Sequence, residues 1–288
     1  MRMLGTMMLS VLLLVPGTAR ADDYEESFSV PFGGTLRIDL ARGSIDVDTH
    51  DAERVEIDAS ISGRAHLDVR QDGDQIIVTS EGSTGLLGFV RTGRVRIRAR
   101  VPERFHLDLA TRGGHIDVQE LVGHVVARTS GGRIEVQEIE GNVAAETSGG
   151  RIEAKEVDGD LLASTSGGSI RASEITGEVE AETSGGSIRV SEAAGSVFAH
   201  TSGGSIDVDF SAVPGGDLRT TGGSIGIRLP EGAGVHLRAR AVGGSVQIDD
   251  DFEIRGERTR GRVDAELNGG GADLEAETTG GSIRVRED

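Results

Sequence analysis

The chain of 288 residues has no cysteine and no tryptophan, and aromatic residues make up only 3% of it. Without cysteine, disulfides, thiolate metal ligands and cysteine nucleophiles are all excluded. So few large aromatic side chains are unusual for a globular core of this length. They are sufficient for a narrow interior filled with Ile, Val, Leu and Ala, so the composition favours a repetitive β architecture.

Long apolar runs are also missing, except for a short one near the start. Arg2, the apolar stretch from Met7 to Val15 and the sequence Ala19-Arg20-Ala21 are typical of a secretory signal peptide. We expect residues 1–21 to be a signal peptide cleaved after Ala21, and the mature protein to be exported to the periplasm or the cell exterior. No later stretch approaches the roughly 20 apolar residues of a membrane span, so no transmembrane segment is predicted.

Basic charge is scarce as well. The chain has 30 Lys and Arg against 48 Asp and Glu, a formal net charge of -18. Such a protein repels nucleic acid and anionic bilayers, so we expect no nucleic-acid partner. An envelope protein or a glycan is the kind of partner that this charge allows.

What the chain does have is a repeat. A phrase of Thr, then Ser or Arg, two glycines, a polar residue and Ile recurs every 18 residues, at Thr111, Thr129, Thr147, Thr165, Thr183 and Thr201. Within a repeat, Ile134 and Val136 on one strand and Val143 and Ala145 on the next point inward by alternation. Gly141 and the pair at 149–150 form the corners, where the missing side chain permits positive φ. The period predicts an all-β, single-domain parallel β-solenoid (a β-helix or β-roll) with coils of about 18 residues.

The repeat divides the mature chain, residues 22–288, into three parts. Irregular coils occupy residues 22–110, regular 18-residue coils residues 111–210, and divergent coils residues 211–288. The phrase returns at Thr220, at Gly243 and at Thr278, with a longer excursion from Asp249 to Arg262 before the last copy. No linker separates these parts. We therefore expect one continuous domain in which each coil stacks on the preceding one.

Several of these segments also resemble a known family. They are Gly43 to Val47, Val101-Pro102 leading to Leu107 to Thr111, the Thr-Ser-Gly-Gly-x-Ile series, and Thr278 to Val285. The chain resembles the bacterial putative-adhesin repeat family, whose central domain is the domain of unknown function 4097. The resemblance implies an adhesin-like role, and it supplies no catalytic residue.

The clearest candidate metal site is a column of glutamates at one corner of consecutive coils: Glu120, Glu138, Glu156, Glu174 and Glu192. Stacked carboxylates repel one another, so the column is either a solvated corner screened by salt or a weak ladder for divalent cations. The histidines lack zinc-site spacing, and the double glycines lack the aspartate of calcium-binding rolls. No cofactor is predicted.

Two surface stripes are candidate partner surfaces. Arg94, Arg96, Arg98 and Arg100 alternate with apolar residues, and they either pair with an acidic strand carrying Asp58 or Asp108 or dock an anionic glycan or a partner. Val126, Leu162 and Phe198 form a broken apolar stripe. Any specificity should lie at outward positions between the phrases, where His115, Arg133 and Arg151 give way to Ser169, Ser187 and Ser205.

These features favour a non-catalytic, exported β-solenoid of the bacterial cell envelope, acting as an adhesin or as a scaffold that binds a ligand or partner. Two alternatives stay open at this point. One is a carbohydrate-active enzyme built on a β-helix, and the other is an accessory protein of an envelope-stress response.

Overall fold

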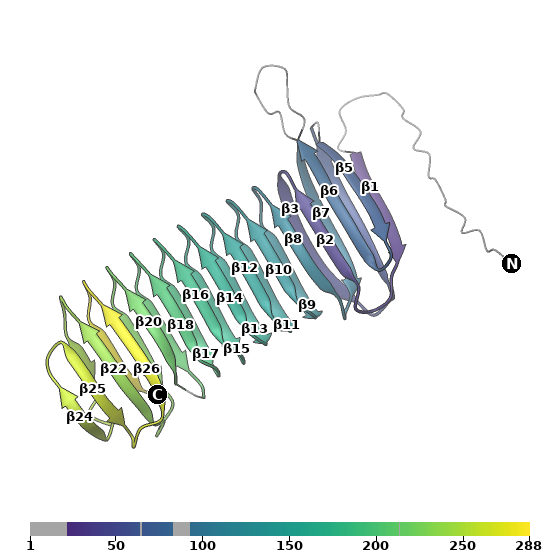
Figure 1. Cartoon of the computed structure of the whole chain (residues 1–288). Helices are drawn as coiled ribbons and strands as arrows, with labels where there is room; N and C mark the ends of the chain where they lie inside the picture. Colours follow the sequence, from purple (N-terminus) through teal and green to yellow (C-terminus); the bar gives the residue numbers. More distant parts are fainter. Residues whose placement is uncertain (1–21, 64, 83–92, 213) are drawn as a thin grey trace, which may run out of the picture.

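The computed structural model describes residues 22–63, 65–82, 93–212 and 214–288, so the predicted signal peptide lies outside the described residues. Within them the chain forms 27 strands and no helix. The strands build two long sheets of an elongated body (Figure 1), and one continuous aliphatic core lies between the sheets. This is the all-β solenoid that the repeat predicts. In this part of the chain no helix is long and apolar enough to cross a membrane.

The two sheets hold 13 and 14 of the described strands. In spatial order, sheet A contains β1 (Asp22–Ser29), β4 (Arg54–Ser62), β7 (Arg94–Pro102), β3 (Gly43–His50), β9 (Ile116–Val122), β11 (Ile134–Glu140), β13 (Ile152–Asp158), β15 (Ile170–Ile175), β17 (Ile188–Ala193), β19 (Ile206–Phe210), β21 (Ile225–Leu229), β27 (Ile283–Glu287) and β23 (Val246–Ile248). Sheet B contains β24 (Ile254–Arg258), β25 (Arg262–Leu267), β22 (Val235–Ala241), β26 (Ala272–Thr278), β20 (Gly216–Thr220), β18 (Val197–Thr201), β16 (Val179–Thr183), β14 (Leu161–Thr165), β12 (Val143–Thr147), β10 (Val125–Thr129), β8 (His106–Thr111), β2 (Thr35–Leu40), β6 (Gln75–Gly82) and β5 (Ala65–Asp72).

Each regular coil contributes one strand to each sheet and pairs in parallel with its neighbours. Ile134 is in register with Ile116 on one side and with Ile152 on the other, and Val143 is in register with Leu161. Identical positions therefore stack about 4.8 Å apart. The four inward columns that contain Ile134, Val136, Val143 and Ala145 are buried throughout the regular coils, as predicted.

A fifth inward column was missed by simple alternation, which would place Glu138 inside and Ile139 outside. The glutamate of each regular coil instead adopts a left-handed backbone, with φ between 54° and 58°, and the strand pairing skips it. This bulge turns the next residue inward. The fifth column consists of Leu121, Ile139, Val157, Ile175 and Ala193, each at most 2% exposed.

The threonine that opens each phrase is buried and joins two coils. The hydroxyl of Thr147 donates to the carbonyl oxygen of Gly132 in the preceding coil at 3.0 Å, and it accepts from the backbone N–H of Gly150 at 3.2 Å. The same pair of hydrogen bonds recurs at Thr129, Thr165, Thr183 and Thr201. A buried polar ladder of this kind has its hydrogen bonds satisfied and fixes the register of the stack.

The two corners require glycine for different reasons. Gly141 has a φ of 146°, as expected for a residue that benefits from lacking a side chain. The pair at 149–150 does not use this freedom, because neither glycine lies in the left-handed region. There the reason is steric, because a Cβ on Gly150 would lie 1.7 Å from the carbonyl oxygen of Gly132, whereas a Cβ on Gly149 would meet nothing closer than 3.9 Å.

The stacking order departs from the sequence order at both ends, which corrects the expectation that each coil lies on the preceding one. The last two strands, β26 and β27, lie between the coil of β20 and β21 and the coil of β22 and β23. The threonine ladder follows this order, because Thr278 donates to the carbonyl oxygen of Gly223 at 2.7 Å. At the other end the coil of β2 and β3 contacts β8 and β9, and Thr111 donates to the carbonyl oxygen of Gly43 at 2.9 Å.

Antiparallel strands end the parallel stack at its N-terminal end in both sheets and at its C-terminal end in sheet B. β1 pairs with β4, β4 with β7 and β5 with β6 at one end, and β25 pairs with both β22 and β24 at the other. The outermost strand of sheet B, β24, has the sequence Ile-Arg-Gly-Glu-Arg and is mostly exposed. Charged edge strands of this kind discourage the addition of further strands.

Candidate functional site

The outer face of sheet A is interrupted near its C-terminal end by a glycine. One row of outward residues crosses five neighbouring strands in register: Arg189 on β17, Asp207 on β19, Gly226 on β21, Arg284 on β27 and Gln247 on β23. We call this the Gly226 row. Because the other members carry long or charged side chains, the missing side chain at Gly226 leaves a gap in the face.

The gap is the floor of an open depression of about 460 Å³. Polar residues from neighbouring rows complete its lining: Ser191, Asp209, Ser224, Arg228, Ser282 and Arg286. Ser224 and Ser282 continue the series in which serine replaces the larger outward residues of earlier coils, where the sequence predicts specificity. The small serines keep the depression open.

Positive charge prevails in the depression, where four arginines face two aspartates. Arg189 is 3.5 Å from Asp207, and Arg228 is 2.9 Å from Asp209, so both aspartates are paired. Arg284 donates to the neutral amide oxygen of Gln247 at 3.0 and 3.2 Å.

Arg286 forms no ion pair or side-chain hydrogen bond with any described residue. Arg284 and Arg286 therefore keep their positive charge without an acidic partner within the described ranges. On a chain with a net charge of -18, this is a local reversal of sign.

The non-sequential stacking order creates this arrangement. Stacking in sequence order would place Gln247 of β23 next to Gly226. The insertion of β27 between β21 and β23 instead puts Arg284 beside Gly226 and Arg286 beside Arg228. Sequence reasoning missed this site because it assumed sequential coils. The glycine in an otherwise charged row was the signal that could have pointed to it.

The predicted glutamate column lies where the sequence placed it, at one corner of consecutive coils. Four of its members, Glu120, Glu138, Glu156 and Glu174, line a shallow depression of about 580 Å³. Lys155 forms an ion pair with Glu156, and this contact raises the pKa of the Lys155 ammonium. Among the described residues, no three His, Asp or Glu side chains converge to hold a metal ion. The cation ladder stays a prediction, and the bulge explains the position of the column.

The arginine stripe lies on β7, between two strands that carry acidic residues. Arg98 is in register with Asp58 on β4 and with Asp46 on β3, and Arg100 forms an ion pair with Glu56 at 2.6 Å. Asp108, the other suggested partner, lies in sheet B. This placement supports the interpretation in which the stripe pairs with an acidic strand.

The apolar stripe lies on the outer face of sheet B, where one row contains Val126, Ala144, Leu162, Glu180 and Phe198. Leu162 is 47% exposed, and Val126 and Phe198 are half-buried. Glu180 separates Phe198 from the rest, as the sequence indicated, so the apolar surface is interrupted along this row.

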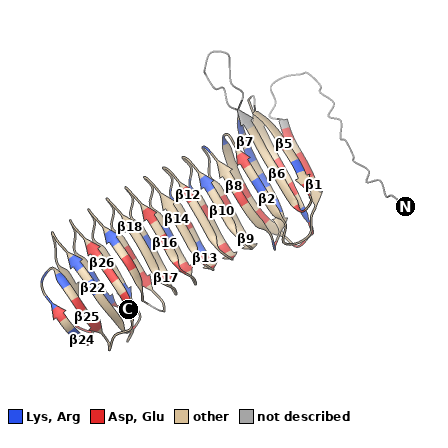
Figure 2. Cartoon of the chain, viewed as in Figure 1, with Lys and Arg blue, Asp and Glu red and all other residues tan. Residues whose placement is uncertain are grey.

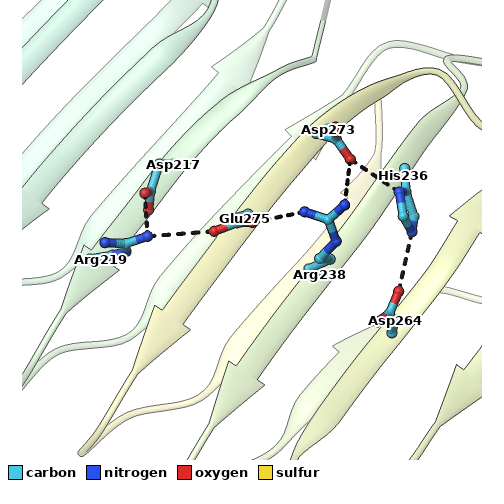
Figure 3. A network of polar contacts seen from close by, with 7 residues as sticks. All are labelled: Asp217, Arg219, His236, Arg238, Asp264, Asp273 and Glu275. Carbon is cyan, nitrogen blue, oxygen red and sulfur yellow. Dashed lines mark hydrogen bonds and ion pairs between the residues drawn. The ribbon is translucent and has the colours of Figure 1, made fainter.

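Beyond Phe198, the same face of sheet B carries a chain of ion pairs across four strands (Figure 3). Arg219 bridges Asp217 at 2.6 Å and Glu275 at 3.4 Å, and Arg238 bridges Glu275 at 2.9 Å and Asp273 at 3.1 Å. His236 ends the chain between Asp273 and Asp264. The contact with Glu275 raises the pKa of the Arg238 guanidinium. Charge of both signs is spread over the length of the molecule (Figure 2), and in this network four carboxylates surround two guanidiniums and one histidine.

Asp217 is the least solvated member of this network. Its side chain is 20% exposed, and its Oδ1 atom is buried without a hydrogen-bond partner among the described residues. His200 Nε2 lies 3.8 Å from that oxygen. Burial raises the pKa of the Asp217 carboxyl, and the charges of Arg219 and His200 oppose this shift. Sequence reasoning missed the network, since its members come from strands that are neighbours in space but do not follow one another in the sequence.

Comparisons with solved structures return proteins of low identity. A "putative cell adhesion protein" from Clostridium sporogenes is 10% identical over 93% of this chain and 100% of that one, with a TM-score of 0.20. A "putative adhesin" from Bacteroides fragilis is 11% identical over 92% and 97%, with a TM-score of 0.36. A "putative lipid binding protein" from Parabacteroides distasonis is 11% identical over 94% and 98%, with a TM-score of 0.34.

No curated protein matches the sequence. A family model does, over almost all of the described structure. The model described as Toastrack DUF4097 matches residues 35–286, which confirms the resemblance seen in the repeat phrases. The chain belongs to the Toastrack DUF4097 family.

Proposed function

We propose that this protein is a non-catalytic, exported binding scaffold of the bacterial cell envelope that acts as an adhesin or holds an envelope ligand. The observation that carries the proposal is the depression at Gly226, where the repeating surface is interrupted and two arginines lack acidic partners among the described residues. A long, stiff stack of coils is suited to presenting such a site away from its point of attachment.

Both the sequence and the structure support this proposal. The sequence of residues 1–21 predicts export, and most polar positions of the regular coils are members of repeated columns. Catalysis needs groups that differ from their surroundings, such as a carboxylate beside a base in an enclosed cleft. The aspartates of the Gly226 depression are instead paired with Arg189 and Arg228.

The test has two parts. Cells that produce the full chain, and cells that produce a form lacking residues 2–21, are fractionated and probed for the protein. The mature protein is then incubated with isolated envelope fractions and sedimented. We expect export that depends on residues 2–21, and co-sedimentation with an envelope fraction without turnover of its polysaccharide.

Two outcomes would overturn the proposal. One is retention of the full chain in the cytoplasm. The other is depolymerisation of an acidic polysaccharide that disappears when a single carboxylate, such as that of Asp207 or Asp209, is replaced by its amide. Capture of one envelope protein without any affinity for glycans would replace the adhesin role by an accessory role.

A further inference from the structure

We propose that the depression at Gly226 binds an acidic polysaccharide, with Arg284 and Arg286 holding its carboxylate or sulfate groups. This inference rests on the proposed function, because it names the class of ligand for the same site.

The charges of the site favour an anion. A guanidinium offers several N–H donors in a planar fork that matches the two oxygens of a carboxylate or sulfate. Arg286 makes no ion pair with a described residue, and Arg284 contacts only the amide of Gln247 among them. Both arginines are exposed on the face of the sheet, so an arriving anion has no internal salt bridge to displace there.

The neutral groups of the lining favour a sugar. Ser224 Oγ accepts from the N–H of Ser282 at 3.2 Å, and Ser282 Oγ accepts from the N–H of Ser245 at 3.2 Å. Each of these hydroxyls still has its own proton to donate. The described lining of the depression contains no aromatic ring on which a neutral sugar could stack. Binding must then depend on charge-assisted hydrogen bonds, which selects for a charged saccharide.

The row geometry favours a chain over a single ion. Arg189 and Arg284 lie on opposite sides of Gly226, three strands apart, which is roughly 14 Å at the usual strand spacing. Arg171 on β15 extends the same row beyond Arg189. An extended polymer lying across the strands would meet positive charge on both rims of the depression.

The overall negative charge does not prevent this contact. At physiological ionic strength, interactions between exposed charges are screened beyond about 8 Å. A thin, linear polysaccharide touches little more than the row itself. A flat anionic bilayer would face a wide area of a chain whose net charge is -18, so the row favours a linear polysaccharide over a membrane.

Gly226 supplies the space without being required by the backbone. Its φ lies outside the left-handed region, and a Cβ there would come within 2.8 Å only of Asp207 Oδ1, the movable end of a side chain. Threonine, which favours strands, can occupy the position and fill the depression. This provides a variant that keeps the fold and removes the site.

The experiment measures binding of the mature protein to polygalacturonate and to chondroitin sulfate by calorimetry. Dextran serves as the neutral polymer, and galacturonate and sulfate ions as the small anions. The variants are Gly226→Thr and the double change Arg284→Gln with Arg286→Gln. Arg128→Gln, which removes one exposed arginine of β10 on the other sheet, is the control. Circular dichroism and thermal melting verify the fold of each variant.

We expect at least one acidic polymer to bind, dextran not to bind, and the small anions to bind more than tenfold more weakly than the polymer. Gly226→Thr and the double arginine variant should each lose tenfold or more in affinity with unchanged melting, as the loss of a charge-assisted contact implies. Arg128→Gln should bind within twofold of the original chain.

Three results would overturn the inference. They are equal binding by Gly226→Thr and the original chain, equal binding of dextran and the acidic polymers, and no binding of either acidic polymer. If the protein still co-sediments with envelope fractions in the last case, the ligand class is wrong and the proposed function stands. If it does not, both fail.

Discussion

The middle coils and the C-terminal coils are built from the same phrase, but they are assembled differently. From β9 to β18 each coil contacts the coil before it in sequence, so the neighbours of any residue lie 18 positions away. At the C-terminal end the last coil is inserted between two earlier ones, and Thr278 bonds to Gly223 across 55 positions. The threonine ladder and the stacked glycines continue unbroken through this insertion.

This comparison shows that the buried threonine ladder holds the coils together, whereas the outward residues make the surface specific. The ladder of the middle coils continues through Thr220 and Thr278, so it joins the inserted coil to the stack as it joins the regular ones. It ends at the coil of β22 and β23, where Ala241 lies in register with Thr278. The outward residues differ. In the middle they repeat as columns, whereas the insertion gives β21 and β22 new neighbours and produces both the Gly226 row and the ion-pair network around Arg238.

The largest effect is expected from a substitution that disrupts the stack in its middle. Gly150→Ala places a methyl group 1.7 Å from the carbonyl oxygen of Gly132 and forces two coils apart. We expect a loss of about 3 kcal/mol or more in the free energy of unfolding, measured by denaturant titration. Gly149→Ala is the matched control and should change stability by less than about 1 kcal/mol. Equal effects of the two changes would contradict the steric account.

The next prediction tests whether the ladder is the same in both regions. Thr147→Val removes the hydroxyl and leaves the N–H of Gly150 without its partner and the carbonyl of Gly132 without this donor. We expect a cost of about 2 kcal/mol in the free energy of unfolding, and the same cost for Thr278→Val. Thr147→Ser and Thr278→Ser keep the hydroxyl and should cost less. A Thr278→Val variant as stable as the original chain would show that the inserted coil does not share the ladder.

A smaller effect is confined to the middle coils, which carry the left-handed glutamates. Asparagine tolerates this backbone better than glutamate, and a β-branched residue tolerates it least. We expect Glu138→Asn to raise the free energy of unfolding by about 0.5 kcal/mol and Glu138→Val to lower it by about 1 kcal/mol. Denaturant titration checks both changes, and a stabilising Glu138→Val would refute the bulge.

The smallest effect belongs to the C-terminal region and depends on pH. Because burial raises the pKa of Asp217 in the folded state, its contribution to stability is complete below the ordinary carboxyl pKa of about 3.9 and is lost as the pH rises through the folded-state value. Asp217→Asn cannot ionise, so it should melt at a slightly higher temperature than the original chain at pH 7. The difference should disappear below about pH 4. A variant that is less stable at pH 7 would mean that the ion pair with Arg219 outweighs the burial of the charge.

Much of the fold follows from the sequence because a repeat converts local alternation into global structure. The column of Ile134, the corner at Gly141 and the position of the glutamates at a corner all follow from the period. The inward orientation of Ile139 does not follow from the period, because it depends on the left-handed glutamate before it, which simple alternation does not predict. The sequence does contain a signal of the bulge: in five coils an apolar residue stands at the same place, where simple alternation would put an outward polar residue.

The candidate site was harder to predict than the fold. Gly226, Arg284 and the serine series were visible as residues, but their proximity depends on which strand lies beside β21. Both orders bury the same apolar columns, because the inward residues of β23 and β27 are equivalent in kind: Val246 and Ile248 on one strand, Ile283 and Val285 on the other. The pattern of apolar residues therefore does not distinguish the two orders.

The central claim of this account is the stacking order of the C-terminal coils, and disulfide formation tests it most directly. Because the chain has no cysteine of its own, only the introduced pair can form a disulfide within the chain. Two double variants, Gly226→Cys with Arg284→Cys and Gly226→Cys with Gln247→Cys, are oxidised and analysed by mass spectrometry. The first pair lies on adjacent strands in register, within the Cα separation of about 4.4 to 6.8 Å that a disulfide needs. The second lies two strands apart, roughly 9.6 Å. A disulfide in the first variant and none in the second is the predicted result, whereas a disulfide between positions 226 and 247 would contradict the inserted coil and the site that depends on it.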